Sequence, residues 1–119
     1  MGVEVLLIGL DPKRVPGVNA QMVESAIAMG QARFDQAGVK IQTLLLDPKV
    51  APKPRIIEML DTAPYRVVVI GGGIRKSDEY VELFEQVVDL VRRHAPQAAI
   101  AFNSNPITSF DAARRWLPR

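Results

Sequence analysis

The chain alternates regularly between apolar stretches typical of β-strands and stretches in which apolar residues recur at helical spacing. Strands are expected over residues 3–10, 39–46, 66–70 and 98–102. Helices are expected over residues 19–36, from Pro54 to a point before Pro64, over 78–94 and from about 108 to 117. Strict alternation with connections of this length is typical of parallel strands joined by right-handed crossovers. We therefore predict one α/β domain that spans residues 1–119.

The order of the strands follows from how polar each one is. The segments "VLLI" and "VVVI" are apolar on both faces and should be central, whereas "VKIQT" alternates with polar residues and should lie at an edge. This favours the order 2-1-3-4 in a three-layer α/β/α arrangement, a shortened flavodoxin-like or Rossmann-like sheet. The loops after the first and third strands then leave in opposite directions. Ligands bind at such a reversal, so we expect a site between "DPKRVPG" and "GGGIRK".

Local signals predict where the helices begin and end. Gly38 should end the first helix. Ser77 is the expected N-cap of the helix over 78–94, whose first turn is acidic and whose last turn is basic, as the helix dipole favours. Thr108, followed three residues later by Asp111, predicts a capping box at the start of the last helix.

The composition excludes several classes of protein. With no cysteine, the chain has no disulfide framework, thiolate metal cluster or cysteine nucleophile. No apolar run reaches the ~20 residues that span a bilayer, and the opening "VEVLLIGLDP" resembles a strand more than a signal peptide. The 15 basic and 13 acidic residues leave a net charge of only +2, too little for a dedicated nucleic-acid binder. We expect a cytoplasmic protein with neither nucleic-acid nor membrane partners.

The loops that follow the strands should form a positive rim. They hold seven of the fifteen basic residues, namely Lys13, Arg14, Lys49, Lys53, Arg55, Arg75 and Lys76. The three successive glycines from residue 71 allow backbone N–H groups to approach a ligand closely, and the helix that follows adds partial positive charge at its N-terminus. Such a rim suits a phosphate or a carboxylate.

A small anionic ligand bound at this rim is therefore the first hypothesis. Its expected contacts are Lys13, Arg14, Gly71, Gly72, Gly73, Arg75 and Lys76, with Asp11, Asn103 and Asn105 as orienting polar groups. The alternative is that the glycines only let a buried strand turn into a helix and that "FNSNP" is an ordinary loop. The dinucleotide fingerprint is incomplete, the phosphate-binding G-x-x-x-x-G-K-[ST] loop is absent, and "DPKRVPGVN" lacks the hydroxyls of a flavin-mononucleotide loop. We expect no cofactor.

A small enzyme is the second hypothesis. Asp11 and Asp47 close the first and second strands, which lie about 4.8 Å apart in a sheet. Two such carboxylates suit a Mg²⁺ with several waters, or an acid/base pair; equally, each Asp-Pro pair suits a simple turn. His94 falls on the opposite rim, so a serine nucleophile has no histidine base within reach. We assign no catalytic residue and no metal ligand.

A self-associating domain without a ligand is the third hypothesis. Phe110, Trp116 and Leu117 are expected to cover the sheet face that the first helix also covers. The expected edge strand "AAIAF" carries no charge to protect it from pairing with another chain. A homodimer is the expected consequence.

Three stretches of the chain carry a resemblance to a known family. They are "VLLIGLDP", "VVVIGGGIRK" and "LFEQVVDLVRRHAPQAAIAFNSNP", and the most specific part is the pairing of "GGGIR" with an "APxAxIAFN" pattern. Over nearly its whole length the chain resembles a family of small uncharacterised bacterial α/β proteins. The resemblance implies a flavodoxin-like or Rossmann-like fold and a bacterial origin, and it implies no activity, substrate or catalytic residue.

Overall fold

The computed structural model describes residues 2–118, and its centre is a four-stranded sheet in which all neighbouring strands are parallel. The strands are β1 (Val5–Leu10), β2 (Ile41–Leu46), β3 (Val67–Ile70) and β4 (Ala99–Phe102). Their order is β2-β1-β3-β4, which confirms the predicted order 2-1-3-4. β1 pairs with β3 from Val5 opposite Val67 to Ile8 opposite Ile70, so the two strands end together at one rim.

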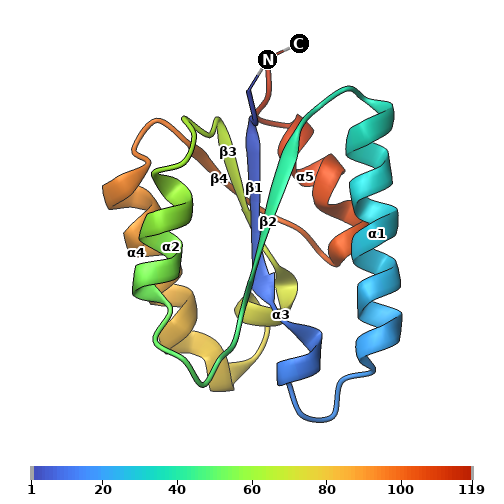
Figure 1. Ribbon diagram of the computed structural model, residues 1–119, viewed down its shortest axis with the longest axis vertical. Helices are drawn as coiled ribbons and strands as arrows, with labels where there is room; N and C mark the ends of the chain where they lie inside the picture. Colours follow the sequence, from blue (N-terminus) through green and yellow to red (C-terminus); the bar gives the residue numbers. More distant parts are fainter. Residues whose placement is uncertain (1, 119) are drawn as a thin grey trace.

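Helices cover both faces of this sheet, which gives the predicted three layers. The α-helices are α1 (Ala20–Gln36), α2 (Lys53–Leu60), α3 (Gly72–Arg75), α4 (Val81–His94) and α5 (Ser109–Arg114). Three short 3-10 turns precede α1, α4 and α5, respectively: η1 (Pro12–Arg14), η2 (Asp78–Tyr80) and η3 (Pro106–Thr108). Figure 1 shows α2 and α4 on one face of the sheet and α1 and α5 on the other. Within residues 2–118, no helix combines the length and apolar character needed to cross a membrane.

The side chains of the central strands alternate between two cores. Leu6, Ile8, Val68 and Ile70 pack on the side of α2 and α4. Val5, Leu7, Val67 and Val69 pack on the side of α1 and α5. All four residues of β3 are fully buried, and each such side chain contributes roughly 1.5–3 kcal/mol to the free energy of unfolding. Strong burial on both faces explains why β1 and β3 are central and β2, with Gln42 exposed, is at the edge.

The predicted helix ends are largely confirmed. The side chain of Asn19 caps α1 by accepting a hydrogen bond from the backbone N–H of Met22, and that of Ser77 accepts from Glu79. Gly38 follows α1 with a φ of 70°, a value that favours glycine. The helix predicted over 78–94 is divided, because residues 78–80 form η2 and the α-helix begins at Val81.

Two predictions near the C-terminus are wrong. The capping box joins Asn105 to Thr108 and begins η3, whereas Thr108 makes no side-chain cap for α5, and Asp111 pairs with Arg33 instead. Trp116 is 57% exposed and lies outside the core. The helix itself is shorter than predicted and ends at Arg114. Phe110 and Leu117 do pack against the core on the α1 side, as expected.

Arginines from neighbouring helices reach both edges of the sheet. Arg55 donates to the carbonyl of Leu45 on β2 at 3.0 Å, and Arg115 approaches the carbonyl of Phe102 on β4 at 3.5 Å. β4 itself carries no charge, but a charged side chain from a distant part of the sequence lies over its end. Such residues discourage pairing with another chain. The homodimer therefore stays a prediction.

The C-terminal half of α1 is anchored to η3 and α5. A side chain at Gly30 would overlap the carbonyl oxygen of Pro106, so helix and turn are in backbone contact. The ring of Phe34 meets Phe110 edge-to-face, with the centroids 5.2 Å apart. Gly30 and Phe34 are the buried residues of α1, and both lie in this half. The N-terminal half of α1 is therefore held less firmly against the rest of the protein.

Gly30→Ala should destabilise the protein although alanine favours helices. The added methyl must push α1 away from η3, which costs about 1–3 kcal/mol, whereas the gain in helix propensity is only ~1 kcal/mol. We expect urea denaturation to give a net loss of roughly 1–2 kcal/mol in the free energy of unfolding. Gly9→Ala is the control, because its Cβ would meet only a Leu45 methyl at 3.7 Å. Equal stability of Gly30→Ala and wild type would show that the close approach is unimportant.

Candidate functional site

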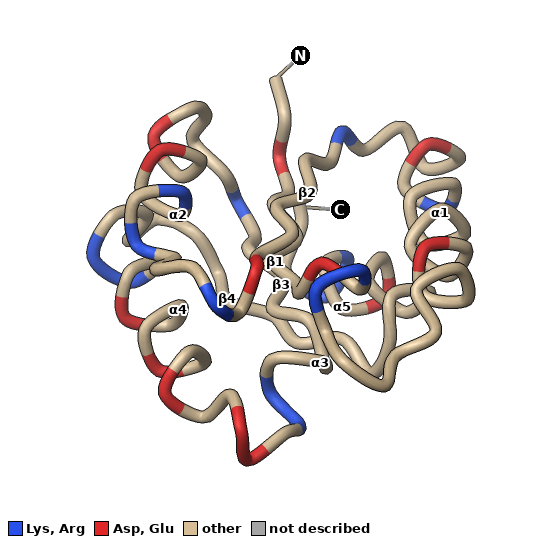
Figure 2. The backbone as a smooth tube through the Cα atoms, turned by 60° about the horizontal axis from the view of Figure 1, so that its bottom comes forward, with Lys and Arg blue, Asp and Glu red and all other residues tan. Residues whose placement is uncertain are grey.

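A pocket of about 720 Å³ opens at the carboxyl-terminal rim of the sheet, where the chain leaves β1 and β3 in opposite directions. Leu7, Gly9 and Leu10 of β1 and the three glycines after β3 line it. Figure 2 turns this rim toward the reader. The pocket therefore lies at the strand reversal where the sequence predicted a site.

One side of the pocket is almost entirely apolar. Six of its lining residues come from the end of β1, the loop after it, α1 and β2: Leu10, Val15, Val18, Val23, Ile27 and Leu45. Val23 and Ile27 belong to the less firmly held half of α1, and they remain only partly buried. Because α1 is anchored through its other half, these two side chains are left partly exposed at the pocket and form its apolar wall.

The opposite side is polar and comes from α3, η2 and residues 103–106. Its polar lining residues are Lys76, Ser77, Glu79, Tyr80, Asn103, Ser104 and Asn105. This side carries charges of both signs, because Glu79 lies on the same wall as Lys76. Figure 2 shows the same mixture, with basic and acidic positions following each other closely along the loops of the rim.

The three glycines differ in what they contribute. A Cβ at Gly71 would lie 3.4 Å from the carbonyl oxygen of Ile8, and one at Gly72 would lie 3.2 Å from that of Ser104. At Gly73 a Cβ would meet nothing within 4 Å. The predicted loop is in fact a helical turn, α3, and its first two glycines allow close packing of β1, β3 and the loop after β4. Only Gly73 leaves open space at the pocket.

Asn103 holds the polar side together from inside. It is buried, its Oδ1 accepts from the backbone N–H of Gly72 at 2.9 Å, and its Nδ2 donates to the hydroxyl of Ser109 at 2.9 Å. The side chain thereby ties α3 to the start of α5. Both ends of its amide group are occupied, so Asn103 positions the glycine turn beside the pocket.

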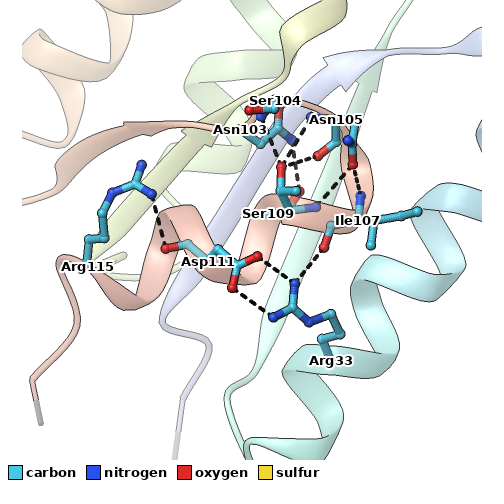
Figure 3. A network of polar contacts seen from close by, with 9 residues as sticks. Arg33, Asn103, Ser104, Asn105, Ile107, Ser109, Asp111 and Arg115 are labelled. Atoms are coloured by element: carbon cyan, nitrogen blue, oxygen red, sulfur yellow. Dashed lines mark hydrogen bonds and ion pairs between the residues drawn. The ribbon is translucent and has the colours of Figure 1, made fainter.

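Asn105 and Thr108 fix the loop that carries this wall. Asn105 Oδ1 accepts from the N–H group of Ile107 (Figure 3). It also accepts from the N–H of Thr108, and Thr108 Oγ1 accepts from the N–H groups of Asn105 and Ser104. The loop is also fastened to α1, because Arg33 donates to the carbonyl of Ile107 and to both carboxylate oxygens of Asp111 at 2.7 and 2.8 Å (Figure 3). The polar wall is thus preorganised by hydrogen bonds within the protein.

The two basic residues after the glycines point in different directions. Arg75 donates to the carbonyl of Asn103 at 2.8 Å and lies over the ring of Phe102, so it is not part of the pocket lining. Lys76 donates from Nζ to the carbonyl of Ser104 at 2.7 Å and does line the pocket. Both cations therefore support the loop after β4, and Lys76 is the one that a bound molecule can reach from the pocket.

Asp11 and Asp47 each close a turn. Asp11 Oδ1 accepts from the N–H of Lys13 at 3.0 Å, and Asp47 Oδ1 accepts from that of Lys49 at 2.9 Å. Neither carboxylate lines the pocket. Within residues 2–118 no group of three or more potential ligands could hold a metal ion. The turn role that the sequence also allowed accounts for both residues.

A second, smaller hollow of about 340 Å³ adjoins the first. Arg14 and Lys49 line it together with Glu79 and Glu82, and Pro16, Glu79 and Tyr80 line both spaces. Arg14 is thus at the rim but outside the main pocket. Lys13 pairs with Glu24 at 3.6 Å on the protein surface, away from both.

The main pocket brings together part of the predicted site and adds residues that the sequence did not suggest. Gly71, Gly72, Gly73, Lys76, Asn103 and Asn105 line it, whereas Asp11, Lys13, Arg14 and Arg75 do not. The residues missed were the apolar ones, such as Val18 and Ile27. The sequence did contain a signal for this apolar wall. Val15 and Val18 are apolar residues in an expected loop, with no strand or helix to bury them.

Asn103→Ala should lower the free energy of unfolding by roughly 1–3 kcal/mol, because the Gly72 N–H and the Ser109 hydroxyl lose their buried partner. Urea denaturation measures this. Ser109→Ala removes only one of the two bonds and should cost less. Ser104→Ala, an exposed neighbour whose hydroxyl makes no hydrogen bond within residues 2–118, should stay within about 0.5 kcal/mol of wild type. A stable Asn103→Ala protein would contradict the role given to this amide.

Acid should weaken the anchor between Arg33 and Asp111. The hydrogen bond from Arg33 holds the pKa of the Asp111 carboxyl below its ordinary value, against a smaller opposing effect of desolvation. The stability that this pair contributes is therefore complete above the unfolded pKa of ~3.9 and is lost as the pH falls through the lower folded value. Asp111→Asn should destabilise the protein at pH 7, and its difference from wild type in urea should shrink toward pH 2. Arg33→Gln should show the same trend. A difference that stays constant with pH would exclude the ion pair as its cause.

No protein-family model matches this chain, and a search of curated proteins likewise finds no match.

Proposed function

We propose that this protein binds a small amphipathic molecule whose apolar part occupies the main pocket and whose anionic group lies at the polar rim. The observation that carries the proposal is the pocket itself, with an apolar wall on one side and preorganised polar groups on the other. Its volume of about 720 Å³ falls within the range of roughly 300–1,000 Å³ typical of small-molecule sites.

The apolar wall supports a ligand with a hydrocarbon or aromatic part. Each Å² of apolar surface removed from water is worth about 25 cal/mol, so the exposed side chains of the loop and α1 favour such a molecule. Val18 is 40% exposed, which is high for a valine beside a pocket. A purely polar anion such as phosphate would leave this surface in water.

The polar rim supports an anionic group of low charge. Lys76 lines the main pocket, and Arg14 and Lys49 line the space next to it. Glu79 borders both and would repel a highly charged polyphosphate. A carboxylate or a single phosphate is therefore the group that the rim accepts best.

Binding is a better proposal than catalysis for this site. The carboxylates that an enzyme would use, Asp11 and Asp47, lie outside the pocket lining and are engaged with backbone N–H groups. The proposal includes a bacterial origin, a cytoplasmic location and a flavodoxin-like fold. The family resemblance and the composition suggest these properties. A small ligand-binding protein of this kind would act as a carrier or a sensor.

Decanoate, which has an apolar chain and one carboxylate, is a direct probe. At about 100 times its dissociation constant it should stabilise the protein by ~2.7 kcal/mol and raise the melting temperature by roughly 10 °C. Inorganic phosphate and succinate should have little effect, and decanol should bind more weakly than decanoate. If none of these probes shifts the melting temperature, the proposal fails.

A matched pair of variants tests whether decanoate binds in the main pocket. Ile27→Trp adds a large side chain to the apolar wall and should weaken decanoate binding at least about tenfold, a loss of ~1.4 kcal/mol. Met29→Trp is the control, because Met29 lies on the same helix, is 56% exposed and does not line the pocket. Equal affinities of the two variants would show that decanoate binds elsewhere.

A further inference from the structure

We infer that the head of the ligand is zwitterionic and lies at the junction of the two hollows, beside Tyr80. This inference rests on the proposed function, and it adds a cationic group to the anionic one. The inference is based on the second hollow, whose charged side chains are not accounted for by a ligand in the main pocket alone.

The two hollows lie next to each other, because Pro16, Glu79 and Tyr80 line both. A molecule that fills the main pocket and reaches past Tyr80 would place its head in the second space. The larger space has the long apolar wall. The smaller one has prolines and four charged side chains, Arg14, Lys49, Glu79 and Glu82. An apolar body and a charged head would thus occupy separate compartments.

The four charged side chains of the second hollow do not neutralise one another. Among residues 2–118, ion pairs within 4.0 Å form between Lys13 and Glu24, between Arg33 and Asp111, and from Asp89 to two arginines. None includes a charge of the second hollow. All four of these side chains are exposed, so they remain free to meet charges of a ligand.

Charges of both signs select a head that carries both. A purely anionic head attracted by Arg14 and Lys49 would face Glu79 and Glu82, and a purely cationic head would face the reverse repulsion. In a zwitterion, the anionic group lies toward the two basic residues and the cationic group toward the two glutamates. The ring of Tyr80 at the junction adds a surface that suits an ammonium group.

Three probes with the same nine-carbon alkyl chain test this inference on the full-length protein. They are decanoate, nonyltrimethylammonium and the zwitterion N-nonyl-N,N-dimethylglycine, each measured by isothermal titration calorimetry below the concentration at which it forms micelles. The zwitterion should bind at least about tenfold more tightly than either singly charged probe. An affinity for decanoate equal to that for the zwitterion, with the cationic probe weaker than both, would overturn the zwitterionic head and leave the proposed function standing. Equal affinities for all three would overturn both the zwitterionic head and the anionic group of the proposed function. Failure of all three to bind would overturn both.

Variants of the second hollow should change which head group the protein prefers. Loss of the basic residues and loss of the acidic residues should change this preference in opposite directions. Removing both cations with Arg14→Ala and Lys49→Ala should weaken the zwitterion and leave the cationic probe as tight or tighter. Removing both acids with Glu79→Gln and Glu82→Gln should make decanoate the best ligand. Lys53→Ala is the control, because this exposed basic residue begins α2 at the same rim but lines neither hollow. If the first two variants behave like Lys53→Ala, the second hollow does not bind the head and the inference is wrong.

Discussion

The lateral pairing of β1 with β3 is the contact on which the rest of the structure depends. Both strands are apolar on both faces, so each can be buried only between other strands and between two helical layers. β1 then continues to a helix on one face and β3 to a helix on the other, and the sheet cannot close the space between the two departing loops. The main pocket is the direct consequence of this arrangement, before any individual side chain is considered.

The depth and chemistry of the pocket depend on how α1 is fixed. The backbone contact at Gly30, the edge-to-face contact of the Phe34 and Phe110 rings and the pairing of Arg33 with Asp111 hold the C-terminal half of this helix against η3 and α5. The same contacts position the loop that forms the polar wall. Because anchoring is confined to one half, the other half presents Val23 and Ile27 to open space. One set of interactions therefore shapes both walls.

The sequence predicted the fold well because the evidence for it is local. Runs such as "VVVI", the cap Ser77 and the turn glycine Gly38 each act within a few residues. The site was predicted less completely, because its residues depend on contacts between distant segments. That Arg75 turns toward the Asn103 carbonyl follows from the packing of α3 against the loop after β4. That Asp111 pairs with Arg33 in place of a cap follows from the packing of α5 on α1. The location was predictable, whereas its apolar wall was not.

The charged residues of the rim fall into two groups, those that the backbone needs at turns and helix starts and those that are left for a ligand. Asp11 and Asp47 are needed to close turns, and the acids at 78 and 79 begin a helical segment, so negative charge at this rim has a structural cause. Glu82 lies just inside α4 and falls under the same dipole argument. The basic residues Arg14 and Lys49 lie in turns closed by those aspartates, yet within residues 2–118 no hydrogen bond or ion pair engages their side chains. Helix and turn chemistry thus explains the acids but leaves these cations without a structural role, and a ligand is the simplest partner for them.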